Sequence, residues 1–192
     1  MKLLLTSAGM RMENKIKEFV SGIGDPIKVL HIMTAAKRET VTDYMHKDVV
    51  AMQAMGWTVQ DIDVDLKTQE ELREILKGVD LVYVQGGNTF YLIDGIRKSG
   101  FEKVLREFLE CGGRYIGVSA GTLVAGLSIE PAVGEDPNEL NMTDFAGMGL
   151  IDTTVDVHCE IGSVAEGKIC LTDDQAVLVS GDDIKVIERE EI

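Results

Sequence analysis

Cysteine and long hydrophobic runs are both scarce in this sequence. The three cysteines, Cys111, Cys159 and Cys170, are an odd number without CxxC spacing, which favours reduced thiols over a disulfide framework or a zinc site. The longest apolar run near the N-terminus, residues 3–5, is far shorter than a signal-peptide core, and no stretch is long enough to span a membrane. These absences predict a cytoplasmic protein without a membrane partner.

Basic residues are also scarce. The 19 Lys and Arg stand against 33 Asp and Glu, a net charge of −14, which would repel a nucleic-acid backbone or an anionic membrane. We therefore expect no nucleic-acid partner. The deficit is strongest between Arg114 and Lys168, where no Lys or Arg occurs. The acidic residues there are Glu130, Glu135, Asp136, Glu139, Asp144, Asp152, Asp156, Glu160 and Glu166. Such a stretch is most often a solvated acidic surface.

The pattern of apolar residues predicts an α/β fold. The 192 residues fit a single domain spanning 1–192. Strand-length apolar runs at residues 3–6, 27–33, 57–64, 81–84 and 115–118 alternate with segments of helical period at 42–55, after a Thr68–Glu71 capping box, and at 101–109. Continuous apolar strands imply burial on both faces. We expect a three-layer α/β/α sandwich with a mostly parallel, flavodoxin-like sheet, and a hairpin of residues 176–179 and 184–187 near the C-terminus.

Residues 117–121 carry the pattern GxSxG. The pattern follows an apolar strand and precedes a segment of small residues, which is the context of a nucleophile elbow. Ser119 is therefore the candidate nucleophile. A glycine-flanked serine in an ordinary strand-to-helix turn is the alternative.

A second glycine-rich segment, Gly86, Gly87, Asn88 and Thr89, follows the strand at 81–84. Acyl transfer needs two hydrogen-bond donors for the developing oxyanion, commonly the amide after the nucleophile and one from a neighbouring strand-end loop. The Ala120 and Gly87 N–H groups are the candidates. The alternative is a strand-end turn with Thr89 as the helix cap.

A serine nucleophile needs a base, and the sequence has three histidines. His31 lies within an apolar strand and His46 lies in a helix among polar neighbours. His158 ends the strand-like run at 154–157, and the carboxyl end of a strand is where ligands bind in open α/β sheets. We favour His158 as the base. Cys159 beside it lacks an elbow and is interpreted as a bystander.

A carboxylate should orient the imidazole of His158. Spacing alone does not choose among the candidates, which are Glu135, Asp136, Asp156, Glu160, Asp173 and Asp174.

The motifs together resemble those of the peptidase E (dipeptidase E, aspartyl dipeptidase) and cyanophycinase family of serine peptidases. The resemblance is carried by GGNTF at 86–90, RYIGVSAGT at 114–122, GMGL at 147–150, and His158. It implies a class I glutamine amidotransferase-like fold and a Ser-His-carboxylate site without metal or cofactor. It also implies Ser119 as nucleophile, His158 as base, and Gly87 and Ala120 as oxyanion donors. The acidic partner implied by the family falls in the loop after the elbow, and we expect Asp136.

The expected substrate is a short peptide cleaved from its N-terminal side. The segment after His158 lacks the arginine-bearing stretch expected for the family, so specificity for an N-terminal aspartate is not secured. A cation for an anionic side chain would have to come from Arg11, Lys37 or Arg38, and we expect Asn88 and Arg38 to bind substrate. The alternatives are a non-catalytic amidotransferase-like module that binds small molecules, and a small serine esterase. A homo-oligomer is left open.

Overall fold

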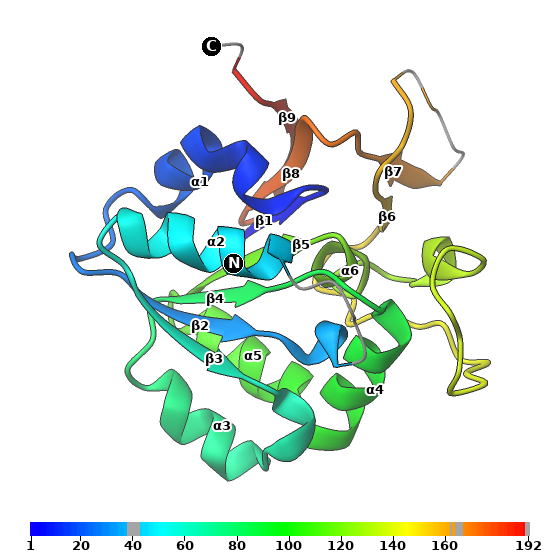
Figure 1. Cartoon of the computed structure of the whole chain (residues 1–192), viewed down its shortest axis with the longest axis horizontal. Coiled ribbons are helices and arrows are strands. Elements are labelled where there is room, and N and C mark those ends of the chain that lie inside the picture. The colour runs from blue at the N-terminus through cyan, green and yellow to red at the C-terminus, as the bar shows by residue number, and fades with distance from the viewer. Residues whose placement is uncertain (38–42, 162, 164–166, 191–192) are drawn as a thin grey trace.

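A central seven-stranded sheet organises the protein (Figure 1). The computed structural model describes residues 1–37, 43–161, 163 and 167–190. The strand order is β3-β2-β4-β5-β1-β8-β9. The strands are β1 (Lys2–Thr6), β2 (Lys28–Ile32), β3 (Thr58–Ile62), β4 (Leu81–Val84), β5 (Arg114–Val118), β8 (Gln175–Ser180) and β9 (Asp183–Glu188). The first five run parallel, and β8 joins β1 in antiparallel fashion and forms the expected hairpin with β9.

Helices cover both faces of this sheet, which confirms the three-layer sandwich (Figure 1). Alternate residues of a strand point to opposite faces. Leu4 therefore packs with α1 and α2, whereas Leu3 and Leu5 pack with α3, α4 and α5. The helices are α1 (Glu13–Val20), α2 (Asp43–Ala54), α3 (Gln69–Leu76), α4 (Thr89–Ser99), α5 (Phe101–Glu110) and the short α6 (Ala120–Leu123).

Short elements complete the chain. A two-stranded parallel sheet pairs β6 (Thr154–Asp156) with β7 (Lys168–Cys170) beside the main sheet. Single 3-10 turns follow or precede the larger elements at η1 (Gly9–Met12), η2 (Thr34–Ala36), η3 (Val64–Leu66) and η4 (Glu130–Ala132). In the described part of the chain, no helix is both long and apolar enough to cross a membrane.

Local sequence signals account for the helix ends. Thr68 and Glu71 form the predicted capping box of α3, with the Thr68 N–H donating to Glu71 Oε2 at 2.8 Å. Asn88, and not Thr89, caps α4, because its side-chain oxygen accepts a hydrogen bond from the Tyr91 N–H at 3.1 Å. An Asn immediately before the first helical residue is one of the most favourable N-caps.

The parallel arrangement determines where a site can form. The carboxyl ends of β1, β4 and β5 are neighbours at one edge of the sheet, and ligands bind at this edge in open α/β folds. Ser7 follows β1, Gly86 and Gly87 lie just after β4, and Ser119 follows β5. Three chain segments that are far apart in the sequence therefore meet there.

At Gly121, α6 packs directly on β4. A Cβ at Gly121 would lie 2.2 Å from the Val84 carbonyl oxygen, a clash that backbone movement must relieve. We expect Gly121→Ala to destabilise the fold by about 3 kcal/mol, which corresponds to a fall in melting temperature of roughly 6–12 °C. Thermal unfolding followed by circular dichroism measures this. Gly78→Ala is the matched control because nothing lies within 4 Å of its added Cβ, and an equal loss in both variants would contradict the clash.

Candidate active site

Ser119 lies on the sharp turn between β5 and α6. Its backbone has φ 48° and ψ −109°, a left-handed conformation that is uncommon for any residue other than glycine. The turn is tight because Gly117 and Gly121 approach each other: a Cβ at Gly117 would lie 2.6 Å from the Gly121 carbonyl oxygen. This strained strand-to-helix turn has the geometry of a nucleophile elbow.

The His158 imidazole faces the Ser119 hydroxyl. Ser119 Oγ lies 3.0 Å from His158 Nε2, within the hydrogen-bond distance that proton transfer requires. His158 follows β6 and also has a positive φ, 56°, which indicates that its position is imposed by the fold rather than by local preference. The structure thus brings together the predicted pair, although 38 residues separate them in the chain.

The carboxylate beside His158 belongs to Asp173. Asp173 Oδ1 lies 2.7 Å from His158 Nδ1, so an Nδ1–H tautomer donates to Asp173 and leaves Nε2 to accept the Ser119 proton. The side chains of His158 and Asp173 are 53% and 48% exposed. The pair is therefore open to a ligand, and its electrostatic strength is reduced by solvent.

Ser7 supports this pair from the end of β1. Its hydroxyl donates to Asp173 Oδ1 at 2.8 Å and accepts from the His158 N–H at 2.9 Å, and it also lies 3.2 Å from Nδ1. Ser7 is fully buried. Partial burial tends to raise the pKa of Asp173, but the hydrogen bonds from Ser7 and His158 outweigh it and hold the pKa below its usual range. The carboxylate is therefore ionised at neutral pH.

The expectation that Asp136 orients His158 does not fit the structure. Asp136 Oδ2 accepts a hydrogen bond from the Thr89 N–H at 2.7 Å, so its carboxylate anchors the loop after the elbow to the start of α4. The other candidate carboxylates also have different surroundings from Asp173. Asp174 pairs with Arg11 and Arg189 at 2.9 and 3.0 Å. Asp156 pairs with Lys168 at 3.8 Å. Glu135 and Glu160 are exposed.

The glycine-rich loop after β4 abuts the elbow. A Cβ at Gly86 would lie 3.2 Å from Ser119 Cβ, and one at Gly87 would lie 2.7 Å from the Ala35 carbonyl oxygen. Gly87 also has φ 132°, which a larger residue rarely adopts. Glycine here permits the close approach of backbone to Ser119 that an amide donor requires. Ala120, the first residue of α6, borders Ser119 from the other side.

Asn88 and Arg38 were expected to bind substrate, with Arg11 and Lys37 as further candidate cations. The Asn88 side chain caps α4 and donates to the Pro137 carbonyl at 2.9 Å, so both ends of its amide bind the protein itself. Arg38 lies outside the described residues. Arg11 makes two 2.9 Å hydrogen bonds to Asp174, and Lys37 pairs with Asp63 and Asp65. Arg11 and Lys37 are therefore already neutralised by carboxylates.

Two cavities flank the Ser119–His158 pair, each of about 330 Å³. The first, which we call the glycine-side cavity, is lined by Ser7, Ala8, Asp48, Gln85, Gly86, Gly87 and Val118 besides the pair. The second, the acidic cavity, is lined by Thr89, Leu123, Pro131, Ala132, Glu135, Asp136, Asp156, Val157 and Cys159 besides the pair. The charged groups among these described lining residues are all carboxylates.

Asp48 is the carboxylate of the glycine-side cavity. It accepts hydrogen bonds from the Tyr83 hydroxyl at 2.7 Å and from Gln85 Nε2 at 3.3 Å. Burial raises the pKa of Asp48, and these hydrogen bonds oppose the shift only in part. Gln85 connects it to the buried His31, whose Nε2 lies 3.3 Å from Gln85 Oε1. His31 thus belongs to a structural network, as its place in a strand suggests.

Cys159 lines the acidic cavity beside the Ser119–His158 pair, but its thiol is not activated. Burial and a hydrogen bond with Cys170 raise the pKa of Cys159 to about 11. The thiol is therefore protonated at neutral pH, and a protonated thiol is a poor nucleophile.

A hydroxyl on a strand-to-helix turn, a histidine within hydrogen-bond distance and a carboxylate behind the histidine form the arrangement of serine hydrolases. The family model for peptidase family S51 matches residues 3–187, and the chain belongs to this family.

Individual relatives agree with this assignment. The chain is 30% identical to an uncharacterized peptidase of Listeria monocytogenes over 158 residues, which are 81% of this chain and 77% of the relative. It is 34% identical to a peptidase E of Shewanella amazonensis over 86 residues, 45% of this chain and 36% of the relative. The crystal structure of a candidate peptidase E protein from Listeria monocytogenes EGD-e matches with a TM-score of 0.88 and 25% identity, covering 97% of this chain and 98% of that one. The resemblance to the peptidase E family is confirmed, and the protein is a serine-type peptidase.

Separate substitutions of Asp173 and Asp136 test which carboxylate orients His158. We expect Asp173→Asn to lower kcat/KM for peptide hydrolysis by about 10³- to 10⁴-fold, because the amide does not hold the imidazole in the productive tautomer. Asp136→Asn is the matched control: it should keep activity within about tenfold of wild type while lowering the melting temperature, because it weakens the bond to Thr89. Steady-state kinetics and thermal unfolding of both variants measure this. Loss of activity in Asp136→Asn alone would contradict the assignment.

Proposed function

We propose that this protein is an exopeptidase that removes residues from the N-terminal side of short peptides through an acyl-enzyme on Ser119. The observation that carries the proposal is the 3.0 Å contact between Ser119 Oγ and His158 Nε2 on a strained elbow. The pair is reached from the two flanking cavities, which are of a size to take amino-acid side chains. We also propose a cytoplasmic location, which the three free thiols support.

The first half-reaction forms the acyl-enzyme. His158 Nε2 takes the proton of the Ser119 hydroxyl, and the oxygen attacks the scissile carbonyl carbon. The Gly87 and Ala120 N–H groups donate to the resulting oxyanion, and each such donor contributes about 2.7–4 kcal/mol of barrier lowering. The C–N bond then breaks, and the leaving amine takes the proton from His158.

The second half-reaction releases the acyl group. His158 takes a proton from a water molecule, whose oxygen attacks the ester carbonyl, and the proton then returns to Ser119 as the C–O bond breaks. Asp173 stays ionised throughout and stabilises the imidazolium in both halves, because the hydrogen bond from Ser7 keeps its pKa low. Ser7 thus acts as a positioning residue for Asp173 and His158.

The charge of the cavities indicates the substrate class. Asp48 lines the glycine-side cavity, and Glu135, Asp136 and Asp156 line the acidic cavity, while no Lys or Arg does so among the described residues. Carboxylates attract the free α-ammonium group of a peptide and repel an anionic side chain. We therefore propose a preference for peptides with a free N-terminus and a neutral or basic first residue, in place of aspartate.

Covalent labelling tests the nucleophile. We expect a fluorophosphonate probe to add one adduct to the wild-type protein, because activated serine hydroxyls attack phosphorus. Ser119→Ala should take up none, and intact-mass measurement reads both. Ser128→Ala is the matched control, because its hydroxyl donates to the Phe145 carbonyl, away from His158, and should label like wild type. Equal labelling of wild type and Ser119→Ala, or none of the wild type, would exclude the proposed nucleophile.

A dipeptide panel tests the substrate class. We expect kcat/KM to fall in the order Lys-Leu, Ala-Leu, Asp-Leu, and N-acetyl-Ala-Leu to resist cleavage. Glu135→Gln should narrow the ratio of Lys-Leu to Asp-Leu by about two- to fivefold, the effect of one exposed charge pair. Glu130→Gln is the matched control, because the exposed Glu130 lies outside both cavity linings. Faster hydrolysis of Asp-Leu than of Ala-Leu would show the opposite specificity while leaving the serine mechanism intact.

A further inference from the structure

Two thiols and a carboxylate gather beside the active-site histidine. The Cys159 and Cys170 sulfurs and a carboxylate oxygen of Asp156 all lie within 4.8 Å of one another. Asp156 ends β6 and Cys170 ends β7, and the two residues are directly paired in the parallel ladder. Cys159 follows His158 in the chain. All three side chains are half-buried, so they are accessible without being fully solvated.

The backbone holds these three residues in place. The Leu171 N–H donates to the Asp156 carbonyl at 2.9 Å, and the Cys159 N–H donates to the Leu171 carbonyl at 2.9 Å. Little backbone ordering is therefore needed to bring the three side chains onto one ligand, which reduces the entropic cost of binding. Because the cysteines come from neighbouring segments, the absence of CxxC spacing does not prevent them from acting together.

We propose that Asp156, Cys159 and Cys170 bind a thiophilic divalent cation such as Zn²⁺, with water in the fourth position. Zn–S bonds of about 2.3 Å and Zn–O bonds of about 2.0–2.2 Å place tetrahedral ligand atoms roughly 3.5–3.8 Å apart. Small side-chain rotations close the remaining gap. Each thiol loses its proton to solvent as the metal binds.

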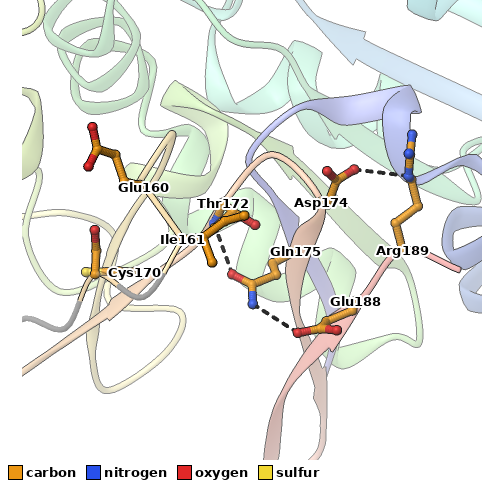
Figure 2. Close-up of a pocket in the computed structure, with 9 residues that line it drawn as sticks. Glu160, Ile161, Cys170, Thr172, Asp174, Gln175, Glu188 and Arg189 are labelled. Carbon is orange, nitrogen blue, oxygen red and sulfur yellow. Dashed lines mark hydrogen bonds and ion pairs between the residues drawn. The ribbon is translucent and has the colours of Figure 1, made fainter. Parts of the chain in front are cut away.

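The surroundings favour entry of a cation from solvent. Asp156 and Cys159 line the acidic cavity. Cys170 lines a third cavity, of about 620 Å³, which also contains Glu160 and Asp174. Figure 2 shows Cys170 on one side of this third cavity, with Asp174 and Arg189 on the other. The cations Lys168 and Arg189 oppose entry. Lys168 Nζ lies 3.8 Å from Asp156 Oδ2, and Arg189 lines the third cavity but is paired with Asp174 at 3.0 Å. Asp156 Oδ1 also accepts from the Val157 N–H at 3.0 Å.

A bound metal would connect the two segments that hold the catalytic imidazole and its carboxylate. Cys159 is adjacent to His158, and only Leu171 and Thr172 separate Cys170 from Asp173. Metal binding itself does not depend on the peptidase mechanism, so its test uses spectroscopic and chemical readouts.

Cobalt binding to the reduced protein tests the site. With Co²⁺ as the probe and a non-thiol reductant present, we expect a thiolate-to-cobalt charge-transfer absorption and the visible bands of tetrahedral Co²⁺ at one equivalent. Cys170→Ser should reduce the charge-transfer band to half or less, because it removes one of the two thiolates, and Asp156→Asn should weaken cobalt binding. Cys111→Ser is the matched control, because this exposed thiol lies at the end of α5, outside the cluster. Lys168→Gln should tighten binding by about two- to fivefold, since it removes one repelling charge.

Alkylation of the wild-type protein gives a second readout that does not depend on a variant folding. With Zn²⁺ bound, iodoacetamide should modify Cys111 and spare Cys159 and Cys170, and a chelator should remove this protection. The proposal is overturned if the wild type gives no thiolate-to-cobalt band, if Cys170→Ser retains the band at full intensity, or if the two cysteines form only a disulfide when reductant is removed and are not protected by Zn²⁺.

Discussion

The turn after β5 holds Ser119 at φ 48° and ψ −109°, and its neighbours leave no room for the backbone to relax. A Cβ on Gly117 would clash with the Gly121 carbonyl, and a Cβ on Gly121 would clash with the Val84 carbonyl. The left-handed conformation is therefore imposed by the packing of α6 on β5 and β4. It directs the Ser119 hydroxyl out of the sheet edge, where His158, the glycine loop and both cavities meet it. Strain at this one residue is the condition for the rest of the site.

The imidazole is fixed from the opposite side by a part of the chain that has no motif. Ser7 follows β1, the strand between β5 and β8. Its hydroxyl bonds to both the backbone of His158 and the carboxylate of Asp173. A buried hydroxyl with three polar neighbours is well ordered, because leaving any of them unpaired would cost about 1–3 kcal/mol. The central position of β1 thus links the elbow to the separate β6–β7 sheet that carries His158.

The sequence predicted the parts of the molecule that depend on local chemistry. The strands at residues 3–6, 81–84 and 115–118 agree with β1, β4 and β5 to within one residue at each end, because buried parallel strands are continuous apolar runs. The elbow and the capping box at Thr68 were also predictable. Asp173 could not be singled out, because it was one of six candidate carboxylates after the elbow and only the path of the chain around β7 and β8 selects it. Ser7 carries no signal at all, since many serines follow strands. Asn88 lies directly before α4, a position that favours an N-cap. The expectation that Asn88 binds substrate did not take this capping role into account.

The carboxylates around the site have opposite effects on the two charges that acyl transfer creates. Asp48, Glu135, Asp136 and Asp156 line the flanking cavities, and Asp173 adds a negative charge behind the imidazole. Together they stabilise the imidazolium and destabilise the oxyanion. The described lining residues include no Lys or Arg to offset the second effect, so in the proposed mechanism the oxyanion depends on backbone N–H dipoles. The two glycines after β4 are consistent with this mechanism. A Cβ at Gly86 would lie 3.2 Å from Ser119 Cβ, and Gly87 has φ 132° with no room for a Cβ beside Ala35. Preorganised neutral donors can stabilise an oxyanion in spite of the surrounding negative charge.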